Sequence, residues 1–325
     1  MVRHLKNKKI YNFDHSSFPE GSFDHNILSS NNFTVLNGNF ANPFDESQQR
    51  YIDVYSHEKT FHNDYKIKGY NDIDLDIEYI TNQDAFRSEP FEKLNSKNIN
   101  IVVAGCSYTF GEGIHAENTW HSILGKKIEK LSKKPVKVYN LGVTGGSNSL
   151  AIKNILVFIK KYGKPDYIFI GATHYSRTPI ATRSRHLING GLGANPAMGK
   201  ERYDALLKYM KSFNSDSAKF NFVNLMQTFE AYTNAAGITF KWFFAIGGFN
   251  DFVDDNSLFE DIFDNAIQTK HTFDFTIAGN VPLSSPRIYP NTENIPFWYI
   301  GKDGHHPGVA WHSSMADQIF ESLKI

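Results

Sequence analysis

The sequence has a single cysteine, Cys106, among its 325 residues, so no disulfide can form within the chain. Folding therefore needs no oxidising compartment. The sequence also lacks an excess of charge of either sign, because 34 Lys and Arg residues balance 34 Asp and Glu residues. This balance argues against a nucleic-acid-binding protein that works through bulk positive charge. We expect no nucleic-acid partner.

Long hydrophobic runs are missing as well. No stretch approaches the roughly 18 apolar residues that a membrane-spanning helix needs. The basic segment 1–10 is not followed by the apolar run of a secretory signal. We therefore expect a soluble protein without a signal peptide, cytoplasmic or virion-associated, and without a membrane partner.

Motifs for metals and nucleotides are also absent. The 13 histidines include no His-Glu-x-x-His pair, and no Gly-x-x-x-x-Gly-Lys-Ser occurs. Gly142, Gly145 and Gly146 follow an expected strand, but they lack the spacing of a dinucleotide-binding loop. Asp303, His305 and His306 could pair with a metal, but a role that needs no metal explains Asp303 and His306. We expect no cofactor and no metal.

Two regions differ in composition. Residues 1–95 are rich in Asn, Asp, Ser, Phe and Tyr and show little sustained periodicity. We interpret them as an irregular accessory region with short strands near 34–36, 50–55 and 77–80. Its aromatic content is too high for a purely disordered tail, so we expect it to wrap onto the domain formed by residues 96–325.

Strands and helices alternate in the second region. Apolar runs predict buried strands, and apolar residues at helical spacing between them predict amphipathic helices. This alternation indicates βαβ units and a parallel sheet covered on both faces. The strands are expected at 98–105, 136–140, 166–171 and 239–246, and the last helix at 315–323. Residues 178–200 look like a loop and 201–235 look helical, which suggests a helical insertion at about 178–235.

Ligands of parallel α/β sheets bind at the carboxyl ends of the strands, so chemistry is expected just after each strand. The first strand runs into Gly105-Cys106-Ser107. A serine placed there can expose its hydroxyl as a nucleophile if a base lies nearby. The same sequence is also compatible with an ordinary turn.

A partner for this serine occurs before the last helix, in Asp303-Gly304-His305-His306. An Asp three residues before a His can accept the imidazole Nδ1–H, which leaves Nε2 free to take the serine proton. The alternative is a polar turn in which Asp303 caps the helix.

Taken together, these segments resemble the signature blocks of the SGNH/GDSL hydrolase superfamily, over residues from about 98 to 325. Gly105-Cys106-Ser107 corresponds to the Gly-Asp-Ser block, with Ser107 as nucleophile. The run from Asn140 to Gly145 corresponds to the second block, whose glycine N–H serves the oxyanion hole. Asp303 and His306 correspond to the fifth block. The resemblance implies a three-layer α/β/α sandwich with a parallel sheet of about five strands.

The sequence departs from the family pattern at two positions. Cys106 replaces the Asp before the nucleophile. We interpret it as a small buried hydrophobe rather than as a rival nucleophile, because its side chain should point away from the face that Ser107 occupies. Thr173 stands where the third block has an oxyanion-binding Asn. Losing such a donor typically costs ~10²–10³ in turnover. Asn250, after the fourth expected strand, is an alternative donor.

Three further residues are candidates for binding the substrate. His174 and Arg177 follow the third strand, where a basic side chain could bind a carboxylate, a phosphate or a sugar hydroxyl. Asn148 stands at the start of the helix after Gly145, where it could contact the substrate or cap the helix.

The resemblance therefore implies a serine ester hydrolase. It would act on short acyl esters, acetyl esters first, through an acyl-enzyme, and an ester of carbohydrate is the favoured substrate. One alternative is an O-acyltransferase with the same triad. Another is a non-catalytic binding or structural protein on the same scaffold. A third is a virion component that forms homo-oligomers or a virion assembly through residues 1–95.

Overall fold

The computed structural model describes residues 81, 82, 84, 86–181, 187–190, 200–246, 266, 267 and 306–323. Their centre is a parallel sheet with the strand order β2-β1-β3-β6. Its strands are β1 (Ile99–Gly105), β2 (Val136–Asn140), β3 (Tyr167–Ala172) and β6 (Thr239–Phe244). Trp242 of β6 also forms a parallel bridge to Ala266, so a further segment continues the sheet beyond β6. The arrangement fits the expected sheet of about five strands.

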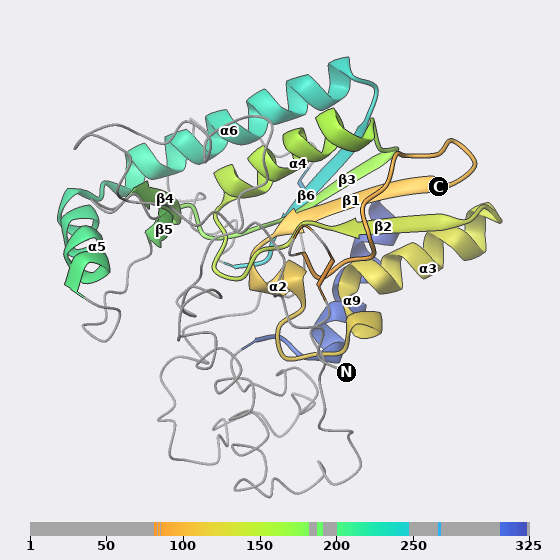
Figure 1. Ribbon diagram of the computed structural model, residues 1–325, viewed down its shortest axis with the longest axis horizontal. Coiled ribbons are helices and arrows are strands. Elements are labelled where there is room, and N and C mark those ends of the chain that lie inside the picture. Colours follow the sequence, from red (N-terminus) through yellow and green to blue (C-terminus); the bar gives the residue numbers. More distant parts are fainter. Residues whose placement is uncertain are drawn as a thin grey trace, which may run out of the picture.

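Helices cover both faces of this sheet (Figure 1). On one face lie α4 (Asn148–Tyr162) and α6 (Ser215–Ala235), and on the other lie α3 (Trp120–Ser132) and α9 (Val309–Ser322). Alternate residues of β1 point to the two cores: Val102 packs toward α4, and Ile101 packs toward α3. This confirms the predicted three-layer α/β/α fold. Among the described helices, none is long and apolar enough to cross a membrane.

The strand order locates the site. In a sheet with this order, the connections from β1 and β3 leave in opposite directions, and ligands bind outside the carboxyl ends of these two strands. The two strands are in register, with Gly105 opposite Gly171. The residues that follow them are therefore brought together at one edge of the sheet.

The structure differs from the expected loop and helical insertion at 178–235. An antiparallel hairpin, β4 (Thr178–Ala181) and β5 (Leu187–Gly190), occupies part of the expected loop. Its strands have four residues each and contain Pro179, so they carry no readable strand pattern. Helix α5 (Lys200–Ser212) follows. Helix α6 is no insertion, because it contributes to the core on the sheet and connects to β6.

The segment before β1 belongs to the α/β domain. Phe86 and Phe91, which the sequence analysis assigned to the accessory region, are buried in the core on the α4 face. Phe91 makes ring contacts with Tyr139, Phe158 and Tyr162. The domain therefore begins before residue 96. The strands expected near 34–36, 50–55 and 77–80 lie outside the described residues.

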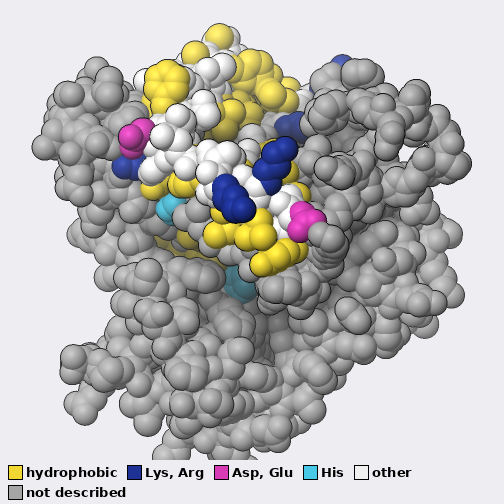
Figure 2. All heavy atoms as spheres, turned by 90° about the vertical axis from the view of Figure 1, so that its left-hand side faces the viewer, with side chains coloured by type: hydrophobic (Ala, Val, Ile, Leu, Met, Phe, Trp, Pro, Cys, Tyr) yellow, Lys and Arg dark blue, Asp and Glu magenta, His cyan; other side chains and the backbone are white. Residues whose placement is uncertain are grey.

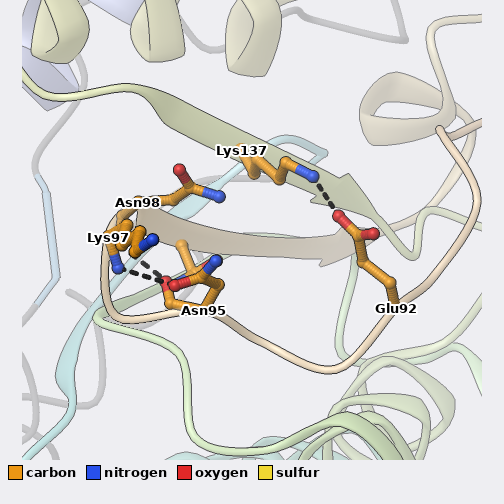
Figure 3. A network of polar contacts seen from close by, with 6 residues as sticks. Glu92, Asn95, Lys97, Asn98 and Lys137 are labelled. Atoms are coloured by element: carbon orange, nitrogen blue, oxygen red, sulfur yellow. Dashed lines mark hydrogen bonds and ion pairs between the residues drawn. The ribbon is translucent and has the colours of Figure 1, made fainter.

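Polar contacts fix this segment along β2 and at the turn into β1 (Figure 3). Glu92 forms an ion pair with Lys137 of β2. The Asn95 side-chain oxygen accepts a hydrogen bond of 2.9 Å from the Lys97 backbone N–H, which closes the turn into β1. The turn lies at the amino end of β1, opposite the expected site.

Candidate active site

Ser107 begins the short helix α2 (Ser107–Phe110), two residues after β1 ends. The turn requires glycine at Gly105, whose φ is +154°, because a Cβ there would lie 2.5 Å from the Gly171 carbonyl oxygen. The Cys106 carbonyl accepts the N–H of Thr109 and of Phe110, at 3.0 and 2.9 Å. Within the described part of the chain, no group accepts a hydrogen bond from the Ser107 N–H.

Cys106 itself is fully buried. It belongs to the hydrophobic cluster that the sheet forms with α3 and α9. It therefore occupies the space of a small apolar side chain, as the sequence analysis suggested.

The loop after β2 packs directly against α2. A Cβ on Gly142 would lie 2.4 Å from the Phe110 backbone nitrogen, so only glycine permits this approach. The Val143 N–H donates to the Gly105 carbonyl over 3.0 Å, which ties the loop to the end of β1. Gly145 has a left-handed φ of +68° in the same loop. The loop thus places Gly145 beside the turn that carries Ser107.

Thr173 lies at the corresponding position after β3. Its side chain is 1% exposed, and among the described residues its hydroxyl has no hydrogen-bond partner. Buried hydroxyls are normally paired, so this one calls for an explanation. Because Gly105 and Gly171 are opposite each other, Ser107 and Thr173 each lie two residues beyond a paired position on adjacent strands.

Asn148 holds the backbone of Thr173. Its side-chain N–H donates to the Thr173 carbonyl over 2.8 Å, and its side-chain oxygen accepts the Thr173 N–H over 2.9 Å. Asn148 is 4% exposed. We therefore assign it to positioning Thr173, and its contact with the substrate stays a prediction.

His306 lies just before α9 and reaches the α2 region. Its ring stands edge-on to Tyr108, with centroids 5.6 Å apart. Its Nε2 is 3.4 Å from Oε2 of Glu112, a buried carboxylate. The structure thus brings His306 next to the segment that carries Ser107. Asp303 and Asn250 lie outside the described residues.

Two more histidines are buried beneath this segment. His121 lies 3.0 Å from the Thr109 carbonyl oxygen through Nε2, and burial lowers its pKa to about 3. His312 accepts the Trp120 N–H at Nδ1 over 3.1 Å. Burial, and then the nearby His121 and His306, lower the pKa of His312 well below 6.5. Both rings are therefore neutral at physiological pH.

Arg87 supports the loop that follows α2. Its guanidinium donates to the carbonyls of Phe110, Gly111 and Ile114, the last over 2.9 Å. Arg87 is 5% exposed and also lies 5.7 Å from the centre of the Phe110 ring. It comes from the segment before β1 and fixes the shape of the loop around Glu112.

His174 and Arg177 share the turn after β3. The His174 Nδ1 accepts the Ser176 N–H over 3.1 Å, and the Arg177 N–H donates to the His174 carbonyl over 3.0 Å. The Arg177 Nη1 is buried and has no hydrogen-bond partner in the part of the chain that the structure describes. Figure 2, which shows the left-hand side of Figure 1, shows dark blue Lys and Arg side chains beside yellow hydrophobic ones on the described surface.

Sequence reasoning missed Glu112 and Arg87. The signal for Glu112 was its position between Gly111 and Gly113, five residues after the candidate nucleophile. For Arg87 the sequence offers no comparable signal. Within the described residues, no group of His, Cys, Asp and Glu side chains has the arrangement of a metal site.

No protein-family model matches this chain, and no curated protein matches it. Solved structures with a similar fold include esterases and G-D-S-L family proteins. The psychrotrophic esterase EstA from Pseudoalteromonas sp., inhibited by monoethylphosphonate, is 16% identical, with a TM-score of 0.36 over 70% of this chain and 97% of that one. A putative lipolytic protein of the G-D-S-L family from Desulfitobacterium hafniense is 13% identical, with a TM-score of 0.37 over 69% and 99%. A two-domain esterase active on acetylated mannans is 16% identical, with a TM-score of 0.39 over 70% and 49%.

Proposed function

We propose that this protein is a serine ester hydrolase that acts on short acyl esters, acetyl esters first. The observation that carries the proposal is the buried, unpaired hydroxyl of Thr173. Thr173 lies two residues beyond the paired position Gly171 of β3, as Ser107 lies two residues beyond Gly105 of β1. Adjacent strands lie about 4.8 Å apart. A hydrogen-bond donor kept unpaired beside a nucleophile is what a developing oxyanion requires.

In the proposed mechanism, the Ser107 hydroxyl attacks the acyl carbonyl while His306 takes its proton. The oxyanion accepts hydrogen bonds from the N–H groups of Ser107 and Gly145 and from the Thr173 hydroxyl, with Asn250 as the alternative third donor. His306 then protonates the leaving alcohol, and Asp303 orients the imidazole. Water, activated by His306, releases the acid from the acyl-enzyme. The mechanism uses no cofactor.

The surroundings of Thr173 support this role. Asn148 binds both the N–H and the carbonyl of Thr173 and so fixes the backbone of that residue. The threonine side chain, which is shorter than the family's asparagine, is therefore held in a defined position. We infer that Arg177 and His174, in the turn that follows, contact the alcohol part of the substrate. Cationic and imidazole side chains bind hydroxyl oxygens, which favours the ester of a carbohydrate over that of a long-chain lipid.

The proposal is tested with a chromogenic acetyl ester and purified protein. We expect Ser107→Ala to abolish turnover. We expect Thr173→Val, which has the same shape without the hydroxyl, to lower kcat about 10²-fold. Thr173→Ser keeps the donor and should retain most of the activity. Circular dichroism checks that each variant is folded.

Two results would contradict the proposal. One is wild-type protein that hydrolyses no short acyl ester across a pH series around 8. The other is turnover that persists in the Ser107→Ala variant. If Thr173→Val were as active as wild type, the third donor would be assigned to Asn250, which Asn250→Ala would then test.

A further inference from the structure

The proposed mechanism leaves Glu112 without a role, although its carboxylate is the acidic group seen next to His306. Its Oε2 lies 3.4 Å from Nε2 of His306, and its side chain is 3% exposed, against 17% for His306. Carboxylates are rarely buried to this extent unless they are paired with a cation or with hydrogen-bond donors. The contact therefore calls for a role.

The loop holds Glu112 in place on both sides. Its N–H donates to the Ser107 carbonyl over 3.1 Å, which ties it to the nucleophile's own helix. Arg87 binds the carbonyls of Gly111 and Ile114, one before and one after Glu112. The carboxylate is thus attached to the same rigid turn as Ser107, whereas His306 comes from the far end of the chain.

The charges around His306 come from several elements. Tyr108 of α2 faces the ring edge-on, and His312 of α9 interacts with it electrostatically. His121 of α3 and Arg87 act on His312 in turn. Both His121 and His312 are neutral because they are buried. Arg87 is the cation of this group, and Glu112 supplies a negative charge in direct contact with His306.

We propose that Glu112 is a positioning residue for His306: its carboxylate lies beside Nε2, the nitrogen that takes the serine proton, holds the imidazole near the nucleophile's turn and stabilises the imidazolium that forms when Ser107 loses its proton. The catalytic consequence rests on the proposed function. Glu112 acts alongside Asp303, which the mechanism assigns to the same ring. An anion within about 4 to 6 Å favours the charged form of a neighbouring group.

The test compares Glu112→Gln with Glu117→Gln, a control on the same connection at an exposed position in η2 (Ala116–Asn118). Removing the charge should lower the His306 pKa by about one unit. The acid limb of the kcat/KM profile then moves to lower pH by a similar amount. We expect kcat at pH 8 to fall about tenfold, the equivalent of one pKa unit, with little change in KM. The Glu117→Gln profile should match wild type.

Glu112→Asp is the second variant, in case the glutamine is not tolerated. It keeps the charge at a longer distance, so its acid limb should lie between those of wild type and Glu112→Gln. Profiles of Glu112→Gln and Glu112→Asp that both coincide with wild type would overturn the proposal.

A measurement without substrate separates this inference from the proposed function. The His306 pKa is read by NMR on ¹⁵N-histidine-labelled full-length protein, with the signal assigned from His306→Asn. A lower His306 pKa in Glu112→Gln supports the contact even if wild type hydrolyses no ester, in which case only the proposed function fails. An unchanged pKa in a protein whose Ser107-dependent activity is intact overturns the role of Glu112 alone.

Discussion

The two buried neutral histidines predict a steep loss of stability in mild acid. His121 has a pKa of about 3 in the folded protein, and that of His312 is also well below 6.5. In the unfolded chain both return to about 6.5. Below pH 6.5 the unfolded chain therefore binds protons at these two histidines that the folded protein does not bind. The contribution of the two histidines to the free energy of unfolding is fully present above pH 6.5 and is lost as the pH falls below it.

The magnitude follows from the distance in pH. Between pH 6.5 and pH 5, each histidine lowers the free energy of unfolding by about 1.4 kcal/mol per pH unit, which gives about 2 kcal/mol in all. The pair together should lower the free energy of unfolding by about 4 kcal/mol between pH 7.5 and pH 5. That is a large part of the roughly 5 to 15 kcal/mol that stabilises a typical domain.

Urea unfolding at pH 7.5 and pH 5 measures this loss. Tryptophan fluorescence is a suitable signal, because Trp120 and Trp311 are buried and their rings contact His121 and His312. His121→Gln keeps an N–H for the Thr109 carbonyl, and His312→Asn keeps an acceptor for the Trp120 N–H. Each variant should lose about 2 kcal/mol less than wild type between the two pH values.

His115→Gln provides the control for replacing a partly buried histidine outside this pair. The reasoning would be refuted if His121→Gln and His312→Asn lost as much stability in acid as wild type. The acid sensitivity would then come from other groups.

Three further changes act on the support of the site. Arg87→Met removes guanidinium hydrogen bonds to three buried carbonyls and should lower the free energy of unfolding by at least 3 kcal/mol in urea. Gly142→Ala forces α2 away from the loop after β2, and a shift of about 1 Å should lower kcat/KM about 10²-fold. Asn148→Ala removes both hydrogen bonds to Thr173, so kcat should fall with little change in KM, as steady-state kinetics would show. Unchanged kinetics in the last two variants would contradict the assigned geometry.

The fold was predictable because buried parallel strands have a recognisable pattern in the amino-acid sequence. Each central strand is a short apolar run followed by glycine or a polar turn, and helical spacing separates the runs. The same logic directed attention to Ser107, since chemistry follows strand ends, whereas the roles predicted for Gly145 and Thr173 came from the family resemblance. The β4–β5 hairpin escaped prediction because its strands are short and contain a proline.

The support of the site was less predictable. Arg87 and Glu112 have charged side chains, and such side chains are usually exposed, so a single sequence gives no reason to bury them. Their burial depends on backbone carbonyls and on His306, groups that only the folded chain brings near. Asn148 was identified as important, but its role depends on the distance to one backbone segment, which no local pattern encodes.

The position of Arg87 has a practical consequence for where this domain can be cut. A boundary drawn at the first strand would place the amino terminus at β1, after Arg87, which holds the loop around Glu112, and after Phe91, which packs in the core. A chain that begins at residue 98 should therefore lose the Arg87 hydrogen bonds. It should also expose the ring surfaces of Tyr139 and Phe158 that Phe91 contacts. The core of the described α/β domain thus extends upstream of its first strand.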